Sequence, residues 1–271
     1  MSLSQRRKFK YIYGPVSSWR LGRSLGIDPL SRNKKVCTFN CVYCQIGPNP
    51  RMTAKRKTHI PTKELLDEIK NLPAGLTIDY ITFSGGGEPT LAGNLGEMIE
   101  AVRRIRKEKI TVITNSSLMK NKVIRNDLSL ADVVIAKMDA SSQRSFKNIN
   151  KPITGLKFKD VYSGIKEFRK HYKGKLAIQI MFFDANKDDF KKIAKLAYSV
   201  KPDEIQINTP TRRSPIKPLS KNEIAKITGY FRALRKKTGS KARIISLYES
   251  KPKNVTVINK KAIIRRRGAP K

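Results

Sequence analysis

The sequence predicts an α/β fold in which a parallel sheet wrapped by helices forms a partial (β/α)6 barrel. From about residue 61 onward, stretches with helical hydrophobic periodicity alternate with short apolar runs that are typical of buried strands. Alternation of this kind favours a parallel sheet covered by helices. In addition, a chain of 271 residues, 39% of them hydrophobic, is long enough to build one such domain.

The expected elements follow one another in a regular order. A helix over residues 62–71 precedes an apolar strand over 78–83, which runs directly into a glycine-rich segment. The remaining expected helices cover residues 95–107, 119–126, 158–170, 188–200 and 221–237, and the remaining strands cover 109–114, 132–137, 176–182 and 204–208. About six strands favour a sheet curled into a partial barrel over a closed barrel of eight.

The ends of the chain differ in composition from this central part. We expect the barrel to cover residues 31–240, with a basic N-terminal extension over 1–30 and a basic C-terminal tail over 241–271. The basic side chains of the two ends are Arg6, Arg7, Lys8, Lys10, Lys251, Lys253, Lys260, Lys261, Arg265, Arg266, Arg267 and Lys271. The last 21 residues contain no acid. Such a segment repels itself and is typical of an interaction arm.

The overall charge points to a polyanionic partner. There are 58 Lys and Arg against 21 Asp and Glu, a formal net charge of +37. Adaptation to heat tends to raise Lys and Glu together, so it does not explain a one-sided excess. No stretch approaches the roughly 20 apolar residues of a membrane span, and the first residues lack the apolar core of a signal peptide. We therefore expect a cytoplasmic protein that does not enter a membrane.

The only three cysteines, Cys37, Cys41 and Cys44, have the spacing C-x3-C-x2-C. An odd number without a secretion signal disfavours disulfides, so a set of metal ligands is the better interpretation. Zinc is the alternative, but the two histidines, His59 and His171, stand at no recognisable zinc-ligand spacing from the cysteines. Iron–sulfur clusters are normally held by four thiolates, so three would leave one iron of a four-iron cluster open to an external molecule.

Polar and glycine-rich segments follow the expected strands. Because catalytic residues of such barrels gather at the carboxyl ends of the strands, we expect these segments to meet at one mouth. The segments are Ser84 to Glu88, Thr114 to Ser117, Lys137 to Asp139, Asp184, and Asn208 to Arg213. In the last one, Arg212 and Arg213 are interpreted either as a specific anion clamp or as a solvated basic loop.

The cysteine motif, with Tyr43 directly before its last cysteine, closely resembles that of the radical S-adenosylmethionine (SAM) superfamily. The resemblance implies a [4Fe-4S] cluster on the three cysteines. It also implies that SAM binds the open iron and is cleaved to a 5'-deoxyadenosyl radical. Tyr43 is expected either to stack near the adenine or to pack the loop.

Further segments match the SAM-binding elements of this superfamily. The resemblance implies that Gly86, Gly87 and Glu88 bind the methionine amine of SAM; an ordinary glycine-rich turn is the alternative. Asn115 and Ser117 correspond to positions that contact the ribose, although capping and turn formation explain them almost as well. Lys137 stands where relatives often carry serine, and it either pairs with the SAM carboxylate or reaches solvent.

Three other segments extend the resemblance: residues 13–16, 20–28 and 205–210. Together they look like the iron–sulfur oxidoreductases related to the wyosine-forming tRNA enzymes. That likeness covers the chain to about residue 220. The wyosine-forming enzymes have additional cysteines for a second cluster, and this chain has none to spare. Chemistry with one cluster and one deoxyadenosyl radical is therefore expected.

Three functions remain open from the sequence. The leading hypothesis is modification of RNA, and of a tRNA nucleoside in particular, because Lys and Arg contacts to phosphates provide salt-sensitive affinity. The second hypothesis is a radical SAM enzyme acting on a protein or small metabolite. Its basic surface would then dock an acidic electron donor resembling flavodoxin or ferredoxin. The third is a non-enzymatic iron–sulfur protein that binds nucleic acid or senses redox state, which leaves Glu88 without a purpose.

Overall fold

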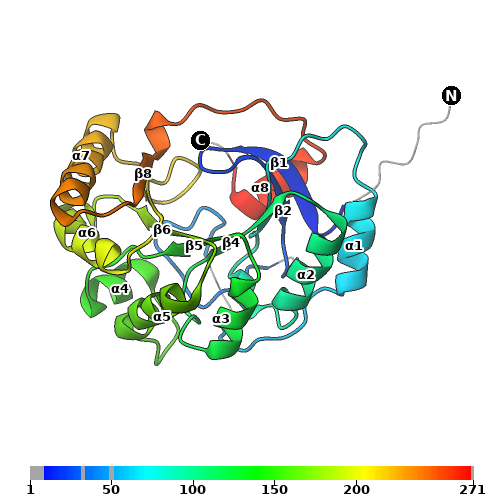
Figure 1. Cartoon of the computed structure of the whole chain (residues 1–271), viewed down its shortest axis with the longest axis horizontal. Coiled ribbons are helices and arrows are strands. Elements are labelled where there is room, and N and C mark those ends of the chain that lie inside the picture. Colours follow the sequence, from blue (N-terminus) through cyan, green and yellow to red (C-terminus); the bar gives the residue numbers. More distant parts are fainter. Residues whose placement is uncertain (1–8, 32–33, 49–51, 270–271) are drawn as a thin grey trace.

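The computed structural model describes residues 9–31, 34–48 and 52–269. These residues form one eight-stranded sheet whose strands lie side by side in chain order (Figure 1). The strands are β1 (Ile12–Ser18), β2 (Gly22–Ile27), β3 (Tyr80–Phe83), β4 (Lys109–Thr114), β5 (Val133–Lys137), β6 (Lys175–Met181), β7 (Glu204–Asn208) and β8 (Arg243–Ser246). β1 and β2 pair in antiparallel orientation, and every following pair is parallel. The curled sheet confirms the predicted partial barrel.

Helices α1 to α7 lie between these strands in the chain and cover the outside of the sheet, and α8 follows the last strand (Figure 1). They are α1 (Thr62–Lys70), α2 (Leu95–Ile105), α3 (Lys122–Ser129), α4 (Gln143–Asn150), α5 (Phe158–His171), α6 (Phe190–Ser199), α7 (Lys221–Thr238) and α8 (Lys260–Arg267). The prediction found six of them to within a few residues. It missed α4, a short and mostly polar helix, and α8, which lies in the expected basic tail.

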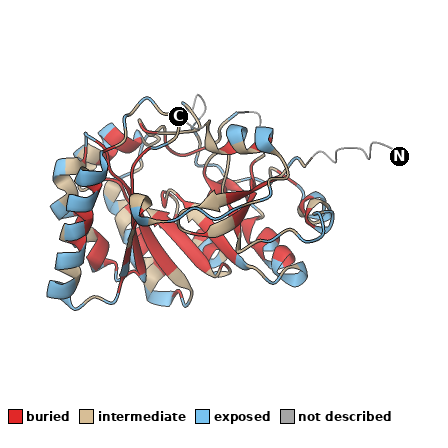
Figure 2. Cartoon of the chain, turned by 90° about the horizontal axis from the view of Figure 1, so that it is seen from above, coloured by how far each residue is buried: buried red, intermediate tan, exposed pale blue. Residues whose placement is uncertain are grey.

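Burial explains why these segments take these structures. The central strands are almost wholly buried, and all five residues of β7 are buried (Figure 2). Strands covered on both faces are continuously apolar, which is why β5 stood out in the sequence. The helices bury one face and expose the other. α7 begins with a capping box in which Ser220 and Glu223 satisfy each other's backbone groups.

The sheet extends into both of the expected extensions. β1 and β2 lie within residues 1–30, and β8 lies within 241–271, so the observed sheet has more strands than the six predicted. The apolar pattern of β1 is interrupted by Gly14 and Pro15, and its pairing with β2 shifts register between Tyr13 and Val16. The three-part division of the chain itself stays a prediction.

Residues after β8 cross from one edge of the sheet toward the other (Figure 1). The backbone N–H of Ile258 donates to the carbonyl of Gly14 over 2.8 Å, and that of Lys253 donates to the Ser17 hydroxyl over 2.8 Å. α8 then packs against β1. The expectation of an interaction arm is therefore corrected over residues 253–267, because this segment is bonded to the barrel.

Some expectations fall outside the described residues. Arg6, Arg7, Lys8 and Lys271 are among them. None of the described helices is long and apolar enough to cross a membrane. The cytoplasmic location stays a prediction.

Candidate active site

One cavity of about 500 Å³ lies inside the barrel, and residues at the carboxyl ends of the parallel strands line it. Most of the side chains expected from the sequence meet there: Cys37, Cys41, Tyr43, Cys44, Gly87, Glu88, Asn115 and Lys137. Gly86 and Ser117 are adjacent in the chain to lining residues but do not line the cavity themselves. Asp184, expected at the same mouth, instead exposes 78% of its side chain and pairs with Lys187.

Each of the three thiols receives a hydrogen bond from a nearby side chain. Asn115 Nδ2 donates to Cys37 Sγ over 3.4 Å, and Asn150 Nδ2 donates to Cys41 Sγ over 3.6 Å. Lys35 Nζ donates to Cys44 Sγ over 3.0 Å. Hydrogen bonds to sulfur tune the charge and potential of iron–sulfur clusters. The three donors therefore suit sulfur atoms that carry negative charge.

Burial changes the acidity of two of these thiols. It raises the pKa of Cys37 to about 12, with a further contribution from the charge of Glu88. It also raises the pKa of Cys41 to about 11, with a further contribution from Asp139. Without a metal the two thiols hold their protons at neutral pH, so binding of iron must release them.

The donor set fits a cluster better than a single ion. In the part of the chain that the structure describes, no three Cys, His, Asp or Glu side chains converge as they would around one metal ion. In a four-iron cluster each thiolate binds a different iron, so the sulfurs surround a larger body. Three soft thiolate donors beside a cavity meet that requirement.

The glycine-rich turn after β3 touches the chain that leads into the cysteines. A Cβ atom on Gly87 would lie 1.7 Å from the carbonyl oxygen of Val36. Val36 N donates to Gly86 O over 3.1 Å, and Glu88 N donates to Val36 O over 3.0 Å. Gly85 meets Asp28 in the same way, with 2.7 Å from a Cβ to the carboxyl carbon. These glycines are therefore required for close packing that positions the cysteine loop.

The carboxylate of Glu88 is buried and accepts hydrogen bonds on both oxygens. Its Oε1 accepts hydrogen bonds from Thr90 N over 3.1 Å and from the hydroxyls of Thr90 and Thr114, each over 2.7 Å. Its Oε2 accepts one from Asn115 N over 2.6 Å. Burial raises the pKa of Glu88, and these hydrogen bonds partly oppose the rise. Oε2 retains room for one further donor from the cavity.

Asn115 and Ser117 hold the cysteine loop in place. Asn115 Nδ2 also donates to the Thr38 hydroxyl over 2.8 Å, and the hydroxyls of Ser117 and Thr38 lie 2.7 Å apart. Thr38 follows Cys37 directly, so both side chains determine where that sulfur lies. Asn115 reaches the cavity as well, whereas Ser117 is buried behind it.

The comparisons with known proteins agree with this geometry. The model of the Radical SAM superfamily matches residues 35–197, which include the cysteines, the glycine-rich turn and Lys137. The chain belongs to the radical SAM superfamily. A UPF0026 protein of Synechocystis sp. is 39% identical over 209 residues, which are 77% of this chain and 78% of that protein.

Solved structures share the radical SAM fold at low sequence identity. Streptococcus suis SuiB bound to S-adenosylmethionine matches with a TM-score of 0.59 and 14% identity, over 81% of this chain and 50% of SuiB. Archaeal TYW1 matches with a TM-score of 0.55 and 15% identity, over 80% of this chain and 73% of TYW1. The predicted family, enzyme class and cofactors are confirmed: the protein is an iron–sulfur enzyme of a family that uses a [4Fe-4S] cluster and SAM.

In this radical SAM enzyme Lys137 and Tyr43 share Asp139 as a partner, a residue that the sequence analysis placed at the mouth without giving it a role. Lys137 Nζ lies 3.3 Å from Asp139 Oδ1 and 5.2 Å from the centre of the Tyr43 ring. The Tyr43 hydroxyl donates to Asp139 Oδ2, and Met181 N donates to Oδ1 over 2.8 Å. Asp139 thus fixes both side chains. Its position two residues after Lys137, at a strand end, was the available signal.

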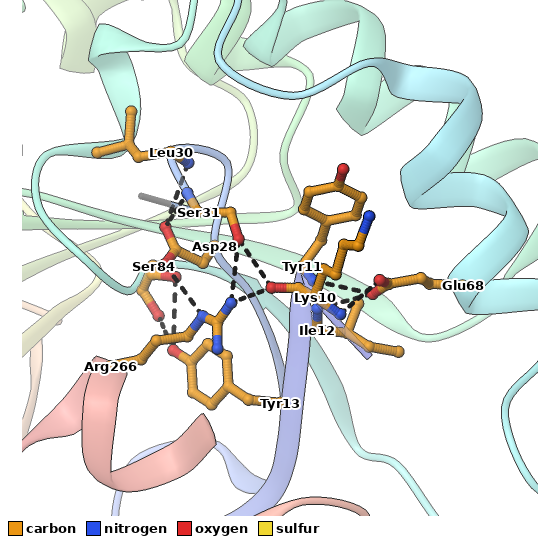
Figure 3. A network of polar contacts seen from close by, with 10 residues as sticks. All are labelled: Lys10, Tyr11, Ile12, Tyr13, Asp28, Leu30, Ser31, Glu68, Ser84 and Arg266. Atoms are coloured by element: carbon orange, nitrogen blue, oxygen red, sulfur yellow. Dashed lines mark hydrogen bonds and ion pairs between the residues drawn. The ribbon is translucent and has the colours of Figure 1, made fainter. Parts of the chain in front are cut away.

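The cavity is also lined by arginines that the sequence did not single out as a group: Arg20, Arg212, Arg266 and Arg267. Arg266 is buried and forms an ion pair with Asp28, with 3.0 Å between Nε and Oδ2 (Figure 3). It also donates to the Ser31 hydroxyl over 3.1 Å and to the carbonyl of Lys10. Arg266 therefore joins α8 to the end of β2. The other three are called the arginine cluster below.

Proposed function

We propose that the protein modifies RNA, with a tRNA nucleoside as substrate, by cleaving SAM reductively at a [4Fe-4S] cluster held by Cys37, Cys41 and Cys44. The observation that carries the chemical part is the convergence of the three thiols and Glu88 on one cavity. When bound, the cluster and SAM supply an electron and a 5'-deoxyadenosyl radical that removes a hydrogen atom from the substrate.

The part of the cavity around the three cysteines and Glu88 is called the cysteine side below, and its residues have separate tasks in this proposal. The three cysteines leave one iron for SAM, and the free lone pair of Glu88 Oε2 accepts a hydrogen bond from the SAM ammonium group. Asn115 lines the cavity where the ribose of SAM would lie, and its amide also holds Thr38. Gly86, Ser117 and Lys137 act through the shape of the loops, and Tyr43 packs the cysteine loop beside Asp139.

The substrate part of the proposal depends on charge. A net charge of +37 is far more than ordinary solubility requires, and phosphate contacts are the use that most directly fits it. The resemblance to enzymes related to the wyosine-forming tRNA enzymes supports the same substrate. An acidic electron donor of the flavodoxin or ferredoxin kind would use part of the same basic surface.

The experiment is a SAM cleavage assay. The protein is reconstituted with iron and sulfide without oxygen, reduced and supplied with SAM, and 5'-deoxyadenosine is quantified with and without bulk tRNA. We expect cleavage that rises at least about tenfold with tRNA and falls at least about a thousandfold in Cys41→Ala, because an incomplete thiolate set loses the cluster.

The outcomes separate the two parts of the proposal. A mass change in digested tRNA would identify the modified nucleoside. SAM cleavage at the same rate with and without tRNA would reject RNA as the substrate and favour a protein or metabolite substrate. A cluster-loaded protein that never cleaves SAM would reject the chemistry itself.

A further inference from the structure

The arginine cluster is half-buried and lacks the carboxylates that normally accompany guanidinium groups inside a protein. Arg20 comes from the turn between β1 and β2, Arg212 from the loop after β7, and Arg267 from the end of α8. None of the three forms an ion pair with any residue that the structure describes. The Nε atom of Arg20 is buried without a partner among the described residues.

Two acids of this part of the barrel are already used by other cations. Asp28 is paired with Arg266, and Glu204 with Lys175 over 2.6 Å. Arg212 donates only to the backbone carbonyl of Arg267. The positive charge of the arginine cluster is therefore not neutralised by the folded chain around it.

The three guanidinium groups also repel one another. Burial, followed by the charges of Arg267 and Arg212, lowers the pKa of Arg20 to about 9. Burial and Arg267 likewise lower the pKa of Arg212 to about 10. Both groups remain charged at neutral pH. Placing like charges together inside a protein costs stability, and sites that retain such a cost are frequently ligand sites.

We propose that Arg20, Arg212 and Arg267 bind a phosphate group of the substrate nucleotide inside the reaction cavity. The planar, multi-donor guanidinium group matches phosphate oxygens in geometry as well as charge. The same cavity contains the three cysteines, so a nucleotide held by its phosphate on the arginine cluster faces the place where the radical forms. That the ligand is a nucleotide rests on the proposed function. That the ligand is an anion rests on the cavity alone.

The position of the cluster agrees with how enzymes act on nucleic-acid bases. A base inside a stack is out of reach, so such enzymes turn the nucleotide out of the helix into a pocket. A phosphate that flanks such a nucleotide then lies beside the pocket. Half-buried arginines in the cavity wall can contact it there, whereas the lysines on the outer surface hold the rest of the RNA.

The first test uses calorimetry to measure the binding of inorganic phosphate to the protein loaded with its [4Fe-4S] cluster. Single substitutions Arg20→Gln, Arg212→Gln and Arg267→Gln are each expected to weaken binding about tenfold, since each removes a charge-assisted contact. The control is Arg104→Gln, which removes an exposed arginine of α2 and should leave the affinity unchanged. Equal binding by the wild type and the three arginine variants would place phosphate on the general basic surface and overturn the proposal.

Thermal stability of the phosphate-free protein provides an independent measurement. If Arg20 served only the fold, Arg20→Gln would lower the melting temperature. A ligand-binding role predicts an unchanged or higher melting temperature, because the substitution relieves repulsion from Arg212 and Arg267. A clear loss of stability, together with unchanged phosphate affinity, would assign Arg20 to the fold alone.

The SAM cleavage assay distinguishes failure of this inference from failure of the proposed function. If tRNA stimulates cleavage in the wild type and equally in the three variants, the function stands and the phosphate site is rejected. If tRNA has no effect but phosphate binding still depends on the arginine cluster, the site stands and the nucleotide substrate is rejected. Loss of tRNA stimulation in the variants alone supports both.

Discussion

The cysteine side of the cavity and the arginine cluster carry opposite kinds of polar chemistry. On the cysteine side nearly every buried polar group has a partner within the chain: Glu88 accepts four hydrogen bonds, and Asp139 holds Tyr43 and Lys137. In the arginine cluster the charges have no carboxylate partner among the described residues. One side is complete by itself, and the other is balanced only by a ligand.

This difference reflects what each side has to do. A cofactor present in every turnover is best met by groups that are already in position, because preorganised dipoles need no rearrangement during reaction. A substrate that enters and leaves has to be attracted, and uncompensated charge does so at a cost in stability. Substitutions on the cysteine side should therefore lower stability, and those in the arginine cluster should lower binding.

The largest effect is expected from Gly87→Ala, which tests the packing of the cysteine side. The new methyl group would overlap with the carbonyl of Val36, so the cysteine loop has to move. We expect a loss of about 4 kcal/mol in the free energy of unfolding, measured by urea denaturation, and loss of bound iron. The control is Gly155→Ala, whose methyl group meets nothing within 4 Å and should cost only about 1 kcal/mol for its positive φ of +85°. Equal losses in the two variants would contradict this account.

The ion pair between Arg266 and Asp28 joins the two sides, and its removal should have the next largest effect. Arg266→Gln leaves a buried carboxylate without its cation, which typically costs about 3 kcal/mol in the free energy of unfolding. The exposed neighbour Arg265→Gln should cost almost nothing. The double variant Asp28→Asn with Arg266→Gln should recover much of the loss. If it does not, the pair is not the cause.

A smaller effect is expected from Thr114→Val. The substitution removes one hydrogen bond to Glu88 and leaves Ser116 N, which donates to the Thr114 hydroxyl over 3.0 Å, without its acceptor. We expect a loss of about 1.5 kcal/mol in the free energy of unfolding. Urea denaturation of Thr114→Val and Arg20→Gln in parallel compares the cysteine side with the arginine cluster directly. A stable Thr114→Val and an unstable Arg20→Gln would reverse the contrast.

The smallest effect concerns Asp79, which holds the turn that carries Arg20. Hydrogen bonds from Arg23, and further ones from Lys253, keep the pKa of Asp79 well below its usual range, against the effect of burial. The folded protein therefore keeps this carboxylate charged while the unfolded chain takes up a proton. Stability from this source is present above about pH 4 and is lost as the pH falls.

Between pH 5 and pH 3 the wild type should lose about 1 kcal/mol more than Asp79→Asn, after allowance for the solvent that reaches this carboxylate. Urea denaturation at the two pH values measures the difference. Parallel curves for the two proteins would show that Asp79 does not contribute in this way.

The sequence predicted those parts of the fold and site whose signals are local. β5 was found because a strand buried on both faces is continuously apolar, and β7 because Ile205 and Ile207 alternate with polar residues. The cysteines and Glu88 were found because their motifs lie within a few residues of one another. β1 was missed because Gly14 and Pro15 interrupt its pattern, and β8 because a four-residue strand carries little periodicity.

The arginine cluster could not be predicted in the same way. Arg20 and Arg267 lie at opposite ends of the sequence, and only the crossing of residues 250–259 brings them to the same cavity. Composition showed that these ends are basic but not that some of their charges face inward. Arg212 was noted with two interpretations open, and the structure places it in the cavity wall.

The contacts of α8 have a consequence for how the protein is made. Arg266 bonds to the end of β2, a Cβ on Gly268 would lie 2.0 Å from the carbonyl of Gln45, and Arg213 N donates to Ala269 O over 3.0 Å. These residues leave the ribosome more than two hundred residues after the cysteines. During synthesis, the wall beside the cysteine loop can therefore be completed only after this late segment has been made.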